Sequence, residues 1–356
     1  MQTPNFTEES QKTEQAQPKR RLLNWRGLVQ ATIGIGALAL VIVRSDTHTL
    51  VEAFKATKVS YLPIPILATV LMTWLMAYRW GVILRIRGDE ISTNRLFVYY
   101  LIAIFFGNFI PGGAVTADVA RLVYASRDVK DKPFVLSTLV YERMTGMFVL
   151  LFIGLGATFA SRVYRPDGAL FYFAEALLTL AFIFSAMLMN DFTSKRLARL
   201  CLWVGELLRI PKIGEAASKT LEAISSLRQY KMMFLTTVLI SVVSRVVWSL
   251  GCYVVALAMD LPLSLAMVFA AMSLVDLIRM LPISVGGLGV REWTMIALFA
   301  NLGIAREQAL LFSLLAFAPV VLTAIAGGII YVSRSGVMRV ERNRAGDAAV
   351  SGANSR

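Results

Sequence analysis

Six long apolar segments constrain this chain more than any other feature of its sequence. They cover residues 27–43, 61–84, 133–160, 168–189, 232–259 and 309–332. Segments of this kind are typical of helices that cross a lipid bilayer, because there each backbone N–H and C=O group must find its partner within the helix. Hydrophobic residues make up 57% of the chain and its mean hydropathy is +0.64, which is too apolar for a soluble globule. The sequence therefore predicts an all-α integral membrane protein with about six full spans.

Two further apolar segments are broken by proline and glycine. One has the sequence LPISVGGLGVRE over residues 281–292, and the other runs from IPGG at 110–113 to Asp118 and Arg121. Each combines a proline, a glycine pair, an acid and an arginine, and one lies in each half of the chain. Discontinuous helices in corresponding halves are typical of transporters whose binding site lies near the middle of the bilayer.

The distribution of lysine and arginine indicates how these segments cross the membrane. Cytoplasmic loops are enriched in Lys and Arg, so we expect the most basic segments to be cytoplasmic, namely 1–26, 85–95, 119–132, 190–231 and 333–356. Successive loops then lie on alternating sides of the membrane only if residues 96–132 enter from the cytoplasm and go back to it, and residues 263–302 enter from the outside and go back there. We therefore expect two re-entrant hairpins that enter from opposite faces as an inverted repeat and meet at their tips.

Arginines within apolar segments are the first candidates for an internal site, and they are Arg79, Arg143, Arg245, Arg279 and Arg291. Each costs about 2.5–3.5 kcal/mol at the bilayer centre on insertion scales unless it is paired or hydrated. The acids that could pair with them are Asp118, Glu142, Asp276 and Glu292. Two interpretations stay open: ion pairs that fix the packing of helices, or arginines that bind an anion.

The anion-binding interpretation ranks the arginines. Arg291 directly follows the glycine turn and is the first candidate for holding a phosphate, with Arg121 second and Arg245 third. Arg279 lies on the other arm of the same hairpin and could face the same cavity. Glycines would let backbone N–H groups approach the anion, and these are Gly112, Gly113, Gly286 and Gly287.

The adjacent residues Glu142 and Arg143 cannot face each other on a helix, because neighbouring side chains point about 100° apart. Each must find a partner on another helix. Glu142 with Arg121, or Arg143 with Asp118, would provide one, and the sequence does not choose between them. We expect Arg79 to lie near the inner interface and to extend its charge toward the lipid headgroups.

Composition and motifs exclude several other classes of protein. His48 is the only histidine of the chain, and no HExxH motif is present, which excludes a zinc protease of that kind. Cys201 and Cys252 form no CxxC pair, and Asp128 and Asp131 lie among basic residues, so we expect no metal and no cofactor. The net charge of +13 suits loops that face an anionic leaflet. We expect no nucleic acid as partner, because no basic stretch carries a binding motif.

Three stretches together resemble the lysylphosphatidylglycerol synthase transmembrane region, a flippase-like family. They are FGNFIPGG with ADVAR over 106–121, VYERMTGM over 140–147, and LPISVGGLGVRE over 281–292. The resemblance covers about residues 25–335, and it departs at Ala117, where the family pattern has glycine before the acid. In lysyltransferase members a large soluble domain that aminoacylates phosphatidylglycerol follows this region. Here 333–356 follow the last span, so the resemblance implies the lipid-handling part without the transferase.

We therefore expect a lipid translocase rather than an enzyme, located in the bacterial cytoplasmic membrane with both termini in the cytoplasm. Its substrate would be an anionic phospholipid or a polyprenyl- or hopanoid-type lipid. The alternatives are an accessory membrane protein, whose charged loop at 190–231 would dock a biosynthetic enzyme, and a membrane lipid transferase that uses Asp118 or Glu292. The expected organisation is a transmembrane domain at 22–335 between disordered tails at 1–21 and 336–356.

Overall fold

The computed structural model describes residues 45–129, 131–162, 175–183, 230–280 and 284–353, with isolated positions at 32, 36, 39, 43, 172, 196, 199 and 203, and describes side chains as far as residue 333. Every regular element in these ranges is helical, which confirms the predicted all-α class. The predicted tail at 1–21, nearly all of the span at 27–43, much of the span at 168–189 and most of the loop at 190–231 lie outside the described residues.

Four described helices are long and apolar enough to cross a membrane. They are α4 (Pro63–Leu84), α7 (Lys132–Arg162), α11 (Lys231–Ala258) and the Arg306–Ser333 part of α14 (Arg306–Ala353). At about 1.5 Å per residue, the 22 residues of α4 extend about 33 Å, which matches the hydrocarbon core of a bilayer. The chain is therefore an integral membrane protein, and these helices coincide with four of the predicted spans.

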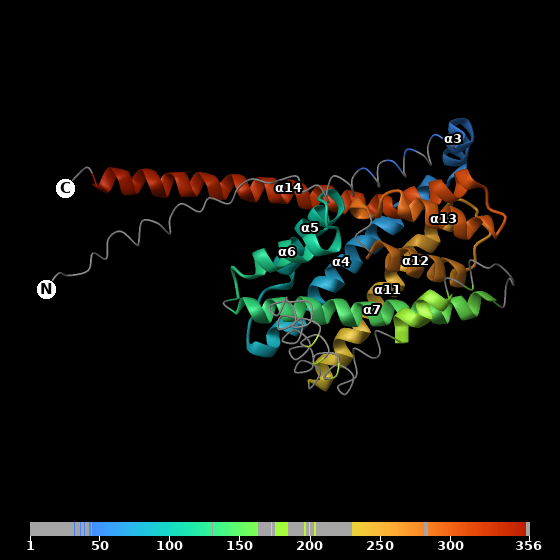
Figure 1. Cartoon of the computed structure of the whole chain (residues 1–356). Coiled ribbons are helices and arrows are strands. Elements are labelled where there is room, and N and C mark those ends of the chain that lie inside the picture. The colour runs from blue at the N-terminus through green and yellow to red at the C-terminus, as the bar shows by residue number, and fades with distance from the viewer. Residues whose placement is uncertain are drawn as a thin grey trace.

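The backbone of α14 continues as a helix beyond its apolar part to Ala353. Extending an existing helix avoids the cost of nucleation, and this segment contains good helix formers, mainly Ala and Arg. In Figure 1 this part of α14 projects well beyond the rest of the bundle.

Two helical hairpins lie between the long helices. α5 (Thr93–Phe109) and α6 (Ala114–Ala125) form the first, while α12 (Leu265–Arg279), the 3-10 turn η3 (Val285–Gly287) and α13 (Val290–Ala300) form the second. With 12 and 11 residues, α6 and α13 extend less than about 20 Å and cannot cross a bilayer. In Figure 1 the first hairpin lies toward the end from which α14 projects, and the second lies toward the opposite end.

The tips of the two hairpins touch. Glycines in the left-handed region of backbone conformation form both turns, with φ of 52° at Gly113 and 61° at Gly286. A Cβ atom on Gly286 would lie 2.8 Å from the backbone oxygen of Asn108, so the second tip presses its main chain against the end of α5. The structure thus brings together the two tips that the repeated Pro-Gly-Gly pattern predicts to meet.

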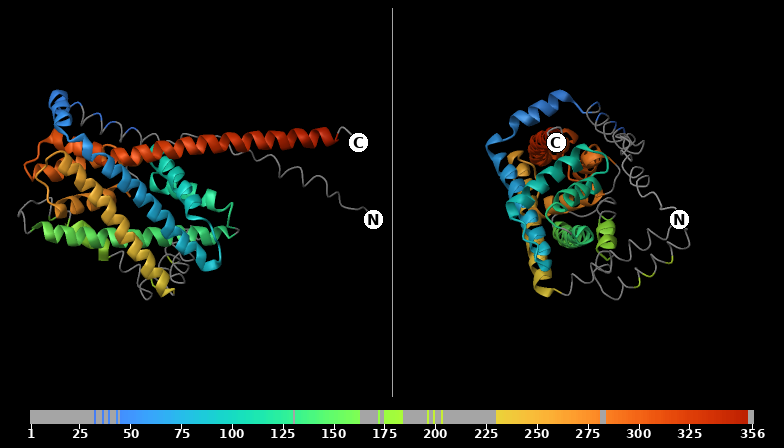
Figure 2. Two further views of the ribbon diagram at one scale, coloured as in Figure 1. Left: turned by 180° about the vertical axis from the view of Figure 1, so that it is seen from behind. Right: turned by 90° about the vertical axis from the view of Figure 1, so that its left-hand side faces the viewer.

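Close approach of backbones holds the long helices together. α4 and α11 lie side by side along one side of the bundle (Figure 2), and a Cβ on Gly251 of α11 would lie 2.9 Å from the Cβ of Ala68 on α4. α14 packs against α5 more closely still, because a Cβ on Gly327 would lie 1.9 Å from the backbone oxygen of Leu101. Helices in lipid associate through small residues at such contacts, because burial of apolar surface there provides no driving force for association.

Short elements complete the described chain. η2 (Arg85–Arg87) follows α4, while α3 (Thr47–Ala56) and η1 (Val59–Tyr61) precede it. The backbone N–H of Lys58 donates to Ala258 O at 2.8 Å, and its ammonium group lies 2.7 Å from Asp260. These contacts tie the segment before α4 to the end of α11.

Candidate functional site

A cavity of about 450 Å³ lies between the two hairpin tips and the helices α4, α7, α11 and α14. This volume is typical of sites for small ligands. Charged residues of its lining are Arg79, Asp118, Arg121, Glu142, Arg143, Arg245, Asp276 and Arg279, and the glycines of its lining include Gly112, Gly113, Gly286 and Gly287. The structure therefore gathers all of the predicted site residues except Arg291 and Glu292.

Glu142 on α7 is the centre of a first charged cluster. It is 1% exposed and accepts hydrogen bonds from Arg79 Nη2 at 2.7 Å, from Arg121 Nη1 at 2.6 Å and from the hydroxyl of Tyr100. Arg79 also donates to Ser241 Oγ at 2.6 Å, which joins α4 to α11. One buried carboxylate thus connects four helices, because its ligands come from α4, α5 and α6.

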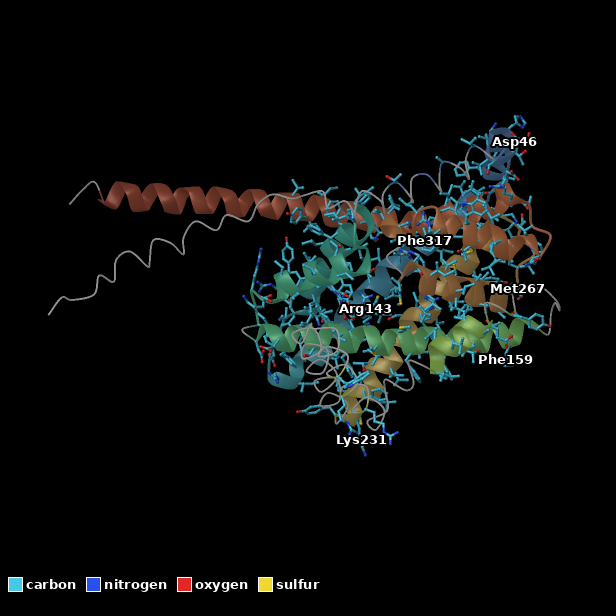
Figure 3. The ribbon with its side chains drawn as sticks, in the orientation of Figure 1. Asp46, Arg143, Phe159, Lys231, Met267 and Phe317 are labelled. Carbon is cyan, nitrogen blue, oxygen red and sulfur yellow. The ribbon has the colours of Figure 1, made fainter. Side chains whose placement is uncertain are left out.

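Asp118 on α6 extends this cluster. It accepts from Arg121 Nη2 at 2.6 Å and from Arg143 Nε at 3.0 Å, with a second contact to Arg143 Nη2. Arg143 rises from α7 toward α6 (Figure 3) and also donates to Ala114 O at 3.1 Å. Both pairings left open by the sequence, Glu142 with Arg121 and Arg143 with Asp118, are therefore formed.

Asp276 on α12 is the centre of a second cluster. Its Oδ2 accepts from Arg245 Nη1 at 2.5 Å, and its Oδ1 lies 3.3 Å from Arg279 Nη1. Arg245 also donates to Ser273 Oγ at 3.1 Å. The guanidinium of Arg279 lies 4.7 Å from the centre of the Phe317 ring, within the range of cation–π attraction.

Arg291 and Glu292 lie behind the cavity rather than in its lining. Glu292 is fully buried, its Oε2 accepts from the backbone N–H of Gly289 at 2.7 Å, and its Oε1 accepts from Arg291 Nε at 2.5 Å. Arg291 itself lies over the ring of Phe317 at 4.5 Å. The first candidate of the sequence is thus held at the start of α13, where Glu292 acts as a capping residue.

Sequence reasoning missed the places of Arg79, Tyr100 and Ser241 in the first cluster. The expectation that Arg79 reaches the interface is wrong, because its side chain is 3% exposed and bound within the first cluster. Tyr100 and Ser241 were not candidates. A signal for Ser241 was available, since Ser241, Ser244 and Arg245 place polar groups on one face of an otherwise apolar span.

The charges of the cavity do not cancel. Among the residues that the structure describes, five arginines and three carboxylates line it, which leaves a formal excess of two positive charges. The ion pairs support the structural interpretation of these residues, because they cross-link α4, α6, α7, α11 and α12. The excess of positive charge supports the anion-binding interpretation. Buried charge without a counter-charge is costly, and a bound anion would supply that counter-charge.

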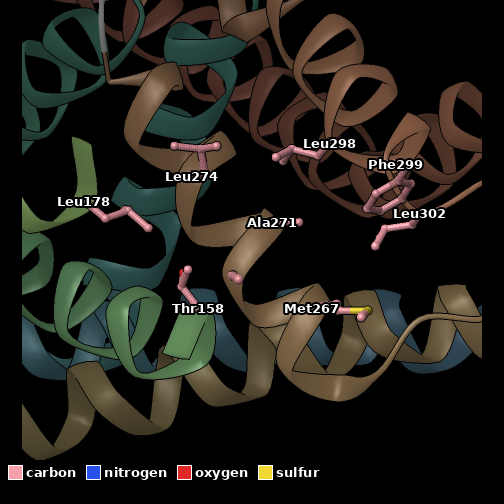
Figure 4. A pocket seen from close by; sticks show the side chains of 9 residues that line it. Thr158, Leu178, Met267, Ala271, Leu274, Leu298, Phe299 and Leu302 are labelled. Carbon is pink, nitrogen blue, oxygen red and sulfur yellow. The ribbon is translucent and has the colours of Figure 1, made fainter. Parts of the chain in front are cut away.

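A second pocket is smaller and apolar. Its volume is about 20 Å³, and its lining includes Thr158, Leu178, Met267, Leu274 and Phe299 (Figure 4). This space admits little more than one water-sized probe. It is a packing defect between α7, α12 and α13 and offers no room for a ligand.

A family of known proteins matches most of the chain. The model of the family described as "Lysylphosphatidylglycerol synthase TM region" matches residues 27–328, a range that includes both hairpins and every residue that lines the larger cavity. No curated protein and no solved structure matches the chain.

Proposed function

Because this chain belongs to the lysylphosphatidylglycerol synthase transmembrane region family, we propose that it is a lipid translocase, which moves an anionic or polyprenyl-linked lipid between the leaflets of a bacterial cytoplasmic membrane. It acts as a transporter and not as an enzyme. The observation that carries this proposal is the large cavity between the hairpin tips, with its formal excess of two positive charges.

The cavity suits the headgroup of such a lipid. A phosphate that leaves water for hydrocarbon loses its hydration, which is costly unless donors replace it. The cavity offers such donors in the guanidinium groups of its five arginines. Its volume accepts a headgroup but not the acyl chains, which stay in the surrounding lipid during transfer.

The exposed face of α6 supports a position of the first hairpin within the membrane. Val115, Val119 and Val123 follow one another at four-residue spacing and are each more than half exposed. Asp118 and Arg121 lie on the opposite, inward face. A short helix with valines outside and charges inside is suited to contact with lipid. Both hairpins are therefore re-entrant in this proposal, with their non-helical backbone groups buried in protein.

The orientation of the protein follows from its basic residues. Arg85, Arg87, Arg95 and Arg127 all lie at or next to the ends of α4, α5 and α6 on the side of the first hairpin. Cytoplasmic loops carry such an excess of arginine. We place this end, with both chain termini, in the cytoplasm.

Movement of labelled lipids across liposomes that contain the purified protein tests the proposal. A panel of anionic, zwitterionic and polyprenyl-linked lipids is compared for the wild type, for Arg245→Gln in the cavity, and for Arg306→Gln as a control. Arg306 lies over the ring of Trp293 at 5.6 Å, outside the cavity lining. Equal elution profiles of the three proteins in detergent show that they are folded.

We expect the wild type and Arg306→Gln to move one class of headgroup and Arg245→Gln to lose this activity. A wild type that moves no lipid of the panel would refute the translocase. Lipid bound without movement would favour the accessory protein, and a modified lipid product would favour the transferase.

A further inference from the structure

The two charged clusters of the cavity differ in how well their arginines are paired. In the first cluster Arg79, Arg121 and Arg143 each contact a carboxylate oxygen at 2.7 Å or less. In the second, Arg245 and Arg279 share the one carboxylate of Asp276, and Arg279 contacts it at 3.3 Å. The second cluster therefore holds the arginine that is most easily drawn to a new anion.

Polar atoms without partners gather on the same side of the cavity. Arg245 Nε, Arg279 Nε and Ser284 Oγ are buried and have no hydrogen-bond partner in the part of the chain that the structure describes. Ser284 is 7% exposed, lines the cavity and immediately precedes η3. The first cluster contributes one such atom, Arg79 Nε. A buried donor without an acceptor is unfavourable, and an anion with several oxygens would supply acceptors.

The N-terminus of α6 lines the same cavity from the other hairpin. Its N-cap residue is Gly113, which provides no side-chain cap, and Gly112, Gly113 and Ala114 all line the cavity. The N-terminus of a helix carries partial positive charge and free N–H groups, which favour phosphate. The contacts of Gly286 with Asn108 and of Gly107 with Gly113 place the end of α5 between η3 and this end of α6.

We propose that the cavity contains a phosphate subsite between the two tips, formed by Arg245, Arg279, Ser284 and the N-terminus of α6. Arg279 exchanges its long contact with Asp276 for the phosphate, while Arg245 keeps its short one. The arginines of the first cluster serve to hold the helices and do not bind the ligand directly. The subsite deepens the proposed function, on which its assignment to a lipid headgroup rests.

Calorimetric titration of the full-length protein in neutral detergent tests the subsite without any lipid movement. The probes are inorganic phosphate, dihexanoyl phosphatidic acid, and dihexanoylglycerol as the phosphate-free analogue. Arg279→Gln is compared with Arg143→Gln, which removes the same charge from the first cluster. Ser284→Ala is compared with Ser244→Ala, because Ser244 Oγ already donates to Ile240 O at 2.7 Å. Arg279→Lys provides a variant that keeps the charge and loses the fork of donors.

We expect phosphatidic acid to bind and dihexanoylglycerol not to bind. Arg279→Gln should weaken the affinity about tenfold or more, Ser284→Ala about three- to tenfold, and Arg143→Gln and Ser244→Ala less than about threefold. Arg279→Lys should fall between the wild type and Arg279→Gln.

The outcomes separate the subsite from the translocase. Equal losses in Arg279→Gln and Arg143→Gln would mean that the whole cavity attracts phosphate through its net charge, and would overturn the subsite. So would a wild type that moves lipid but binds neither phosphate probe. Phosphatidic acid bound without inorganic phosphate supports a lipid-borne ligand, and inorganic phosphate bound equally well supports the subsite with free phosphate as its ligand. Phosphate binding in a protein that moves no lipid would keep the subsite and refute the translocase.

Discussion

Replacing Glu142 by glutamine removes the charge that two buried arginines share. Arg121 would keep its contact with Asp118 at 2.6 Å, whereas Arg79 would keep a neutral partner, Ser241, at 2.6 Å. Breaking a buried ion pair by removal of one partner costs about 3–5 kcal/mol, because the remaining charge is left uncompensated. Since one of the two arginines retains a carboxylate, we expect a loss of about 3 kcal/mol in the free energy of unfolding.

The measurement is unfolding by sodium dodecyl sulfate in mixed micelles, followed by tryptophan fluorescence. Trp80 reports on the cluster, because the guanidinium of Arg121 lies 5.2 Å from its ring centre. The double variant Arg79→Met with Glu142→Gln should regain at least half of the loss, since no unpaired charge then remains on α4. Asp260→Asn breaks an exposed ion pair and should change stability little.

Two results would refute this reasoning. One is a loss of less than about 1 kcal/mol in Glu142→Gln, which would mean that water reaches the cluster and screens it. The other is strict additivity in the double variant, which would mean that the residues 79 and 142 do not interact energetically.

Further predictions concern helix packing, the link before α4 and the turn behind the cavity. Gly327→Ala should lower the thermal midpoint clearly, by a cost of about 1–3 kcal/mol for overpacking, whereas Gly156→Ala, with open space around it, should not. The hydrogen bond and the charge of Asp260 raise the pKa of Lys58 above its ordinary value of 10.5. This ion pair therefore stabilises the fold below pH 10.5, and its contribution is lost as the pH rises through the raised pKa. A profile of stability against pH for Asp260→Asn should lack this alkaline loss. Arg291→Gln should destabilise the fold, measured as a lower thermal midpoint, yet change phosphate affinity less than about threefold in the folded fraction, because Arg291 is outside the cavity lining.

The sequence predicted the architecture well where it depends on long apolar segments and on the proline and glycine residues that interrupt them. Apolar runs located the four described spans, and the Pro-Gly-Gly pattern located both turns. The rule that neighbours on a helix point apart correctly predicted that Glu142 and Arg143 bind to other helices. These features depend on local geometry, which a single sequence contains.

The rest depends on how each helix is rotated against its neighbours, which local geometry does not contain. Arg79 turns inward because α4 packs on α11, where Ser241 meets it. Arg291 follows the glycine turn and was therefore expected in the cavity. Its hydrogen bond to Glu292 and its contact with the ring of Phe317 hold it outside the cavity lining instead. The spacing of Gly289 and Glu292 indicates a capping role for the acid, and this signal could have been found in the sequence.

The contact between the two tips has a kinetic consequence. Main chain meets main chain there, with a hydrogen atom of Gly286 in place of a side chain. A constriction of this type has no rotamer that can swing aside within nanoseconds. Widening it requires one hairpin to withdraw as a rigid unit, a collective motion of microseconds to milliseconds. Under the proposed function, each transfer of a headgroup would be limited by the displacement of whole helices, and the two hairpins would move in a coupled way, because their tips are in contact.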